Sequence, residues 1–291
     1  MGKRILLFLL TNLAILVTLS IVLSLLGIGG YIQPDGAINH TALMVFAFLW
    51  GMGGAFISLL MSRLIAKRAL GVKLVNGQTG HAGLDWLYNT VSRLAQQANL
   101  PMPEVGYYES AEVNAFATGP SKKKSLVAVS SGLLGGMRRE ETEGVLAHEL
   151  AHVQNGDMVT MTLIQGVVNA FVLYLSRVIA GVVRSAVDER SALMIGFAVT
   201  IFLDIVLGIF GMIIVRWFSR AREFRADAGA ATLAGREKMI AALRRLQTTT
   251  RLIETAEPEL ATLKINNKRA MLLFATHPPL EARIAALESM R

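Results

Sequence analysis

Four long apolar stretches constrain this chain more than any other feature of its sequence. They cover residues 5–28, 42–61, 158–183 and 192–215, and each reaches the roughly 20 residues that a helix needs to cross a bilayer. Only 17% of the residues are charged, whereas soluble chains average about 25%. We therefore predict an integral membrane protein with about four transmembrane helices. A signal peptide is the weaker interpretation of the first stretch, because its apolar part would be only about 7–15 residues long.

Basic residues in the loops predict the orientation of these helices. Residues 29–40 contain no lysine or arginine, while Lys3 and Arg4 precede the first stretch and four arginines follow the last one (Arg216, Arg220, Arg222, Arg225). Positively charged loops stay on the cytoplasmic side. We therefore expect both termini and residues 63–157 in the cytoplasm, with residues 29–40 outside. The net charge of +8 is thus a topology signal before it is a nucleic-acid signal, and no nucleic-acid partner is expected.

Two charged residues interrupt the third and fourth stretches. Arg177 lies in the third and Asp204 in the fourth, and charges within membrane spans usually pair or face the protein interior. The two stretches are expected to form a hairpin over residues 158–216. A helical hairpin that enters the bilayer only partly is the alternative interpretation.

The polar segments predict an α+β protease part with a mainly helical composition. Residues 1–62 form the N-terminal membrane part, and residues 63–157 and 217–291 flank the hairpin. Helical periodicity is present over Leu84–Gln97 and over residues 139–155, where Asn155-Gly156 is a stop signal. Short β-type runs lie at Val105–Tyr108, Asn114–Thr118 and Leu126–Ser130, and the three lysines Lys122, Lys123 and Lys124 suit a hairpin turn. A small antiparallel sheet is expected.

The helix over residues 139–155 carries a metal-binding motif, His148-Glu149-Leu150-Ala151-His152. Histidines at positions i and i+4 lie on one helix face, so both imidazoles can reach one ion. Glu149 is placed to polarise a metal-bound water without being a ligand, and zinc makes hydroxide available near neutral pH. A chance pentapeptide with two partly buried histidines is the alternative. The chain has no cysteine and only five histidines, which rules out thiolate zinc sites and disulfides.

A catalytic zinc needs a third protein ligand and one open position. The acidic candidates are Glu223 and Asp227, which lie one turn apart just after the fourth apolar stretch. One of them can bind the metal while the other orients a ligand histidine. The alternative is an exposed helix laced with arginine–glutamate pairs.

Taken in order along the chain, these motifs resemble the HtpX family of bacterial membrane zinc metallopeptidases, which are gluzincins related to the CAAX prenyl proteases. The resemblance rests on the two N-terminal spans and on the continuation of the histidine motif into Val153-Gln154-Asn155-Gly156-Asp157. It also rests on Glu223-Phe224-Arg225-Ala226-Asp227 after a helical hairpin, on Asn114–Gly119 and on Thr276-His277-Pro278-Pro279. Essentially the whole chain is covered, with no departure at the motif positions.

The resemblance implies a role for each site residue. His148, His152 and Glu223 would bind one Zn²⁺, Glu149 would be the general base and Asp227 the partner of a ligand histidine. Asn114 would lie on an edge strand that the substrate extends. His277 would stabilise the oxyanion with Arg283 supporting it, although helix-capping or surface roles are the alternative for both.

The implied function is an endopeptidase that cleaves misfolded or damaged membrane proteins and unfolded chains in membrane protein quality control under stress. A prenyl-peptide processing protease is one alternative, although it would need more spans than four. A membrane scaffold or metal sensor with a chance motif is the other, and it predicts no need for Glu149. The sequence leaves the natural substrates and the oligomeric state open.

Overall fold

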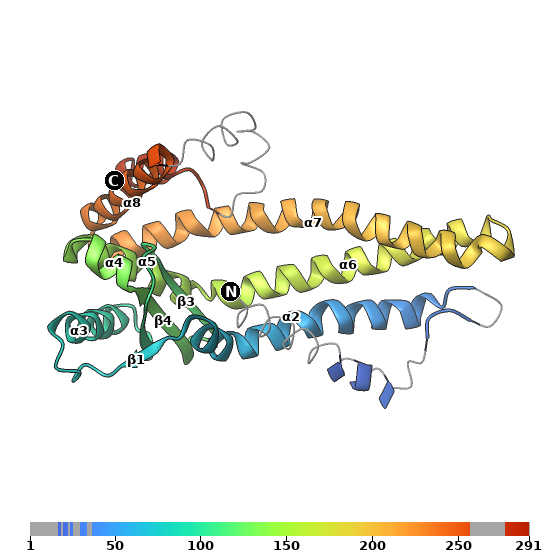
Figure 1. Ribbon diagram of the computed structural model, residues 1–291, viewed down its shortest axis with the longest axis horizontal. Coiled ribbons are helices and arrows are strands. Elements are labelled where there is room, and N and C mark those ends of the chain that lie inside the picture. The colour runs from blue at the N-terminus through green and yellow to red at the C-terminus, as the bar shows by residue number, and fades with distance from the viewer. Residues whose placement is uncertain are drawn as a thin grey trace. The chain divides into compact units, whose positions relative to one another are not determined.

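The computed structural model describes residues 17–18, 20–22, 24–25, 30–33, 37–256 and 277–290 (Figure 1). The predicted first span, residues 5–28, lies mostly outside the described residues, as does Thr276 of the Thr276–Pro279 segment. Two compact units are present, one of residues 1–59 and 160–215 and the other of residues 60–159 and 216–291. The division falls within three long helices, so each unit is described separately below.

The first unit is built from the apolar parts of α2 (His40–Leu70), α6 (Asp157–Ser185) and α7 (Glu189–Ala234). Among the described residues, these three helices are long and apolar enough to cross a membrane. They coincide with the second, third and fourth apolar stretches of the sequence. Leu43 and Ala47 of α2 pack against Leu173 of α6 in a small buried cluster.

The two charges within the hairpin pair with one another, which is one of the two arrangements that the sequence left open. A guanidinium nitrogen of Arg177 on α6 lies 2.5 Å from Oδ1 of Asp204 on α7. The buried Ser176 hydroxyl donates to the same carboxylate oxygen at 2.6 Å. Each charge in this cluster therefore has its counter-ion on the neighbouring helix.

The second unit contains a four-stranded sheet that is mixed, so the expected antiparallel sheet is wrong. The strands are β1 (Lys73–Val75), β2 (Glu104–Tyr108), β3 (Ala115–Ser121) and β4 (Lys124–Ser130), in the order β1-β2-β4-β3. β2 runs parallel to β4, with Val105 opposite Val127, whereas β3 and β4 form the expected antiparallel hairpin at Lys122 and Lys123. Sequence reasoning did not identify the short strand β1.

Burial explains why β4 takes the inner position. Its run Leu126-Val127-Ala128-Val129 is buried on both faces, and a continuous apolar run belongs inside a sheet. β3 carries Gly119 and Pro120, which suit an edge strand better. The tight β3–β4 hairpin therefore inserts β4 beside β2, and the pairing with β2 becomes parallel.

Helices cover both faces of this sheet. On one face, Val105, Val127 and Val129 join the main core with α3 (Ala82–Gln97), α5 (Arg139–Asn155) and α8 (Arg236–Ala256). On the other face, Tyr108, Leu126 and Ala128 pack against the end of α2. The remaining described helices are α4 (Ser131–Gly136) and α11 (Leu280–Glu288). The predicted helices over Leu84–Gln97 and 139–155 are confirmed as α3 and α5.

Candidate metal centre and active site

The helix that carries the histidine motif has well-defined ends. At its start, the backbone N–H of Arg138 donates to the Glu141 carboxylate at 2.8 Å, which satisfies one of the free donors of a helix N-terminus. At its end, Gly156 adopts a φ of +71°. Between these ends, His148 and His152 lie one turn apart on the same face, and both are buried.

A second helix brings the predicted third ligand to this face. Glu223 lies on α7, and its side chain is completely buried. The close approach of α7 to α5 depends on Gly229, where an added Cβ would lie 2.9 Å from the Ala151 side chain. A glycine at this position lets the backbone of α7 come near the motif helix.

Three ligand atoms converge on one point. The Nε2 atoms of His148 and His152 lie 3.1 Å apart. Glu223 Oε2 lies 3.4 Å from His148 Nε2, and Glu223 Oε1 lies 3.3 Å from His152 Nε2. Among the described residues, these three form the one group of histidine, aspartate and glutamate side chains whose geometry suits a metal ion.

The spacing and chemistry of these donors fit zinc. Zinc bonds of about 2.0–2.2 Å in tetrahedral geometry place neighbouring ligand atoms about 3.3–3.6 Å apart, close to the separations found here. Glu223 Oε1 is buried and, within the described part of the chain, has no hydrogen-bond partner, which is costly for a carboxylate oxygen unless a cation binds it. Two imidazoles and one carboxylate make a typical catalytic zinc set.

Each ligand imidazole is held from behind by a carboxylate. Asp227 Oδ1 lies 2.9 Å from His148 Nδ1, which places Asp227 where the sequence predicted a histidine partner. Asp157 Oδ2 lies 2.6 Å from His152 Nδ1, and its side chain is buried. Such contacts fix the ring orientation and leave Nε2 for the metal.

Sequence reasoning missed Asp157 as a site residue. In the sequence, Asp157 stood out only as the last residue of the run that follows the histidine motif. Its position immediately after Gly156 was the available signal, because a chain that turns at a helix end can bring the next side chain back to the last turn. Asp157 is also 3.5 Å from Arg225 on α7.

The C-terminal residues approach the ligands from a third direction. Arg283 on α11 is buried and forms a two-pronged ion pair with Asp227, with Nε–Oδ2 and Nη2–Oδ1 distances of 2.7 and 2.6 Å. Its Nη1 lies 3.5 Å from Glu223 Oε2. The exposed His277 has its Nδ1 2.8 Å from Glu223 Oε2. Both predicted residues thus lie in the site, each against an acidic group.

The carboxylates alter the titration of the ligand histidines. Burial alone would lower the pKa of His152, but the close carboxylates of Asp157 and Glu223 outweigh it and raise the pKa to about 9. For His148, burial is likewise outweighed by hydrogen bonds with Asp227 and Glu223, and its pKa is raised. Protons and a metal cation therefore compete for the same buried negative charge.

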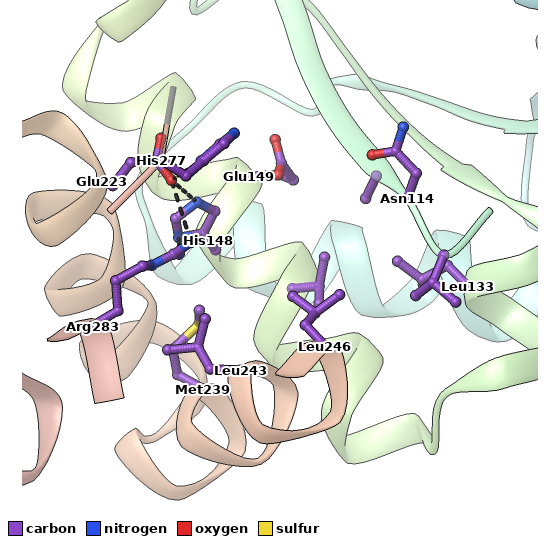
Figure 2. A pocket seen from close by; sticks show the side chains of 13 residues that line it. Asn114, Leu133, His148, Glu149, Glu223, Met239, Leu243, Leu246, His277 and Arg283 are labelled. Atoms are coloured by element: carbon purple, nitrogen blue, oxygen red, sulfur yellow. Dashed lines mark hydrogen bonds and ion pairs between the residues drawn. The ribbon is translucent and has the colours of Figure 1, made fainter. Parts of the chain in front are cut away.

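A pocket of about 130 Å³ opens beside these ligands (Figure 2). Glu149 is half-buried and lines it, and no described residue forms a hydrogen bond to its carboxylate. The predicted residue Asn114 also lines the pocket, directly before the edge strand β3. The site thus places a free carboxylate, a set of metal ligands and a strand edge around one cavity.

Long apolar helices together with this site define the class of protein as a membrane zinc metallopeptidase. Residues 83–291 match the model of peptidase family M48. The chain is 54% identical to protease HtpX of Pasteurella multocida (strain Pm70), covering 99% of this chain and 98% of that protein. It is 50% identical to the protease HtpX homolog of Bacillus subtilis (strain 168), covering 99% and 100%.

The fold is also similar to the crystal structure of S. mikatae Ste24p, with a TM-score of 0.60 at 19% identity. The match covers 99% of this chain and 66% of the Ste24p chain. The chain therefore belongs to the HtpX family of M48 peptidases, and the predicted enzyme class and zinc cofactor are confirmed.

Proposed function

We propose that this protease cleaves misfolded or damaged membrane proteins and unfolded chains, and so serves membrane protein quality control. The observation that carries the proposal is the convergence of His148, His152 and Glu223 beside the free carboxylate of Glu149, in a pocket next to a sheet edge. The active site is proposed to face the cytoplasm, with both chain termini on that side of the bacterial inner membrane, because the loops near the site are basic.

The proposed roles follow the proton path of amide hydrolysis. Bound zinc supplies Lewis-acid polarisation of the carbonyl and lowers the pKa of an attacking water. Glu149 takes the proton of that water as it adds to the carbonyl carbon, and then delivers the proton to the leaving amine nitrogen. The position of Glu149 on the pocket wall, next to His148 but outside the ligand group, suits this transfer.

His277 and Arg283 are proposed to stabilise and position the reacting groups. His277 contacts Glu223 through Nδ1, and in its doubly protonated form the ring would also carry an Nε2–H that donates to the carbonyl oxygen as negative charge develops there. Arg283 acts through Asp227, which orients His148. Arg283 is therefore a positioning residue in this proposal.

The substrate is proposed to bind as an added strand along β3. Hydrogen-bonded positions alternate along an antiparallel pair, and Asn114 accepts a hydrogen bond from the backbone N–H of Ser130 on β4. The backbone groups of the next residue, Ala115, are therefore directed to the free edge. Backbone pairing at this edge gives affinity with little sequence demand, as a quality-control protease requires.

Replacing Glu149 with glutamine tests the proposal. In purified protein, Glu149→Gln should keep stoichiometric zinc and lose cleavage of an unfolded model protein by at least 100-fold, because general acid–base catalysis contributes about 10²–10⁴-fold. Glu140→Gln, an exposed acid at the start of the same helix, is the matched control. Retained activity in Glu149→Gln would contradict the assignment, and exclusive cleavage of a prenylated peptide would favour the processing-protease alternative.

A further inference from the structure

The apolar wall of the active-site pocket suggests what the enzyme recognises in its substrates. One part of the pocket is lined by the ligands and Glu149. The rest is lined by aliphatic and thioether side chains of β3, α4, α5 and α8, together with the residue before β3 (Val113, Ala115, Leu133, Val145, Met239, Leu243, Leu246). Figure 2 shows Leu246 and Leu133 on the side of the pocket where Asn114 lies, away from Glu223 and His277.

From this wall we infer that the pocket is a specificity subsite for one apolar side chain of the substrate, at a position next to the scissile bond. The inference rests on the proposed function, and it adds a substrate preference that backbone pairing along β3 cannot supply. It predicts cleavage beside leucine, methionine or phenylalanine in unfolded chains.

The size of the pocket suits a single side chain. Sites for drug-sized ligands measure about 300–1,000 Å³, whereas an apolar cavity of about 150 Å³ holds one benzene molecule. The 130 Å³ found here includes the space beside the ligands and Glu149, so the apolar part of the pocket accommodates at most one side chain of leucine or phenylalanine size.

The apolar wall of the pocket disfavours charge, whereas Glu149, Glu223 and Arg283 line the other part of the same pocket. Leu133, Leu243 and Met239 are each no more than 2% exposed, and no described residue of the apolar wall carries an ionisable group. A lysine or glutamate side chain placed there would lose its hydration without gaining a partner. Charged residues should therefore be disfavoured at the position that enters the pocket.

The position of the pocket ties this preference to the scissile bond. Val145 lies one turn before His148 on α5, and Ala115 lies on the edge strand that the substrate would extend. Side chains of an added strand alternate between the two faces, so one side chain beside the reacting carbonyl is directed toward α5 and α8. Gly144 permits this arrangement, because an added Cβ would lie 2.6 Å from the backbone oxygen of Lys238 on α8.

Leu246 is the residue that tests the inference with least damage to the fold, because it is only half-buried. Leu246→Trp should fill the pocket, and Leu246→Ala should enlarge it. Leu84→Trp and Leu84→Ala are the matched controls, since Leu84 on α3 is also half-buried against the same core but does not line the pocket. Zinc content identifies any variant whose site has failed to form.

Two measurements test the inference. In both, cleavage by Glu149→Gln serves as the background level. Mass spectrometry of fragments from an unfolded model protein gives the residues that flank each cut. Peptides that differ only at the preferred position, as leucine, alanine or lysine, give kcat/KM. The wild type should cut beside leucine, methionine or phenylalanine, and should prefer the leucine peptide to the lysine peptide by at least tenfold, since small changes in an apolar pocket are worth about 10–200-fold.

Leu246→Trp should lower kcat/KM for the leucine peptide about tenfold or more, and should lower the ratio of the leucine-peptide to the alanine-peptide value. Leu246→Ala should extend cleavage to tryptophan and tyrosine. Glu149-dependent cleavage without an apolar preference, or Leu246 variants with the wild-type preference, would overturn the inference and leave the proposed function intact. Absence of any Glu149-dependent cleavage would overturn the proposed function itself.

Discussion

Two clusters of charged side chains, one in each unit, are balanced in opposite ways. In the hairpin, Arg177 and Asp204 neutralise one another and Ser176 completes the hydrogen bonding. In the metal site, three carboxylates (Asp157, Glu223, Asp227) and one guanidinium, that of Arg283, are buried. Among buried groups alone, the first cluster has no net formal charge and the second has two negative charges in excess, which the half-buried Arg222 and the exposed Arg225 offset only from the periphery.

The difference separates a structural cluster from a ligand site. A neutral cluster is complete as folded, and an additional ion would leave it unbalanced. A buried excess of two negative charges is unfavourable unless a dication or protons compensate for it. Protons bound to His148 and His152 compensate for this charge in the metal-free protein, as the raised pKa values of the two histidines indicate. Bound zinc is the compensating cation that supports hydrolysis.

The largest expected effect comes from removing the ligand carboxylate. Glu223→Ala should abolish zinc binding and cleavage, because it removes a ligand and half of the excess charge. Asp227→Ala should weaken both but leave some metal, since Asp227 acts through His148. Zinc content by elemental analysis and cleavage of an unfolded protein are the measurements. If Asp227→Ala loses all metal while Glu223→Ala keeps it, the two roles are reversed.

The same kind of change in the neutral cluster should affect stability and leave zinc in place. Asp204→Asn leaves Arg177 without its counter-ion, which should cost about 1–3 kcal/mol after allowance for the partial exposure of the pair. Thermal unfolding in detergent measures the loss, and zinc content should remain stoichiometric. The double variant Arg177→Met/Asp204→Met should recover most of the stability. A double variant no more stable than Asp204→Asn would show that the charge pair is not the cause.

A smaller effect is expected when a histidine loses its orienting carboxylate. Asp157→Ala should lower zinc affinity about 10–100-fold, the usual cost of such changes, because His152 loses the contact that fixes its ring. Competition with a calibrated chelator gives the affinity. Glu140→Gln serves as the control, and equal affinities in the two variants would remove Asp157 from the site.

The smallest expected effect is a dependence of folding stability on pH, which only the metal-free protein should show. Since the pKa of His152 is raised from 6.5 to about 9 on folding, its protonation stabilises the metal-free fold fully below pH 6.5. This stabilisation is lost as the pH rises through about 9. Zinc binding at pH 7.5 should release protons, which calorimetry in buffers of different ionisation enthalpy detects. Zinc binding without proton release would contradict the charge balance described above.

The sequence predicted the parts of the site that depend on local geometry. The spacing of His148 and His152 follows from helical periodicity alone, and the pairing of Glu223 with Asp227 follows from the same rule. Arg177 and Asp204 were expected either to pair or to face the protein interior, because isolated charges within apolar stretches are unfavourable. These inferences required only the geometry of a single helix, or of two helices that follow one another in the chain and were therefore expected to be neighbours.

Features that depend on long-range packing could not be predicted in the same way. The position of β4 inside the sheet depends on which strand the helices cover, and the apolar run of β4 was seen without that conclusion. In the sequence, the pocket residues Met239 and Leu243 are indistinguishable from the apolar face of any amphipathic helix. Only the packing of α8 against Gly144 places them at the pocket. Asp157 required the direction of the chain after Gly156, which spacing alone does not supply.

The position of β3 at the end of the sheet bears on the energetics of the proteins that are cleaved. An edge strand can pair only with a segment whose own backbone groups are free, so a helix or an internal strand must open before it is bound. The cleavage rate then follows the equilibrium population of the open segment, and each 1.4 kcal/mol of local stability in the target reduces that population about tenfold. The enzyme would therefore distinguish neighbouring proteins by their local stability. A protein with a weakly stable segment would be cleaved faster than one without such a segment.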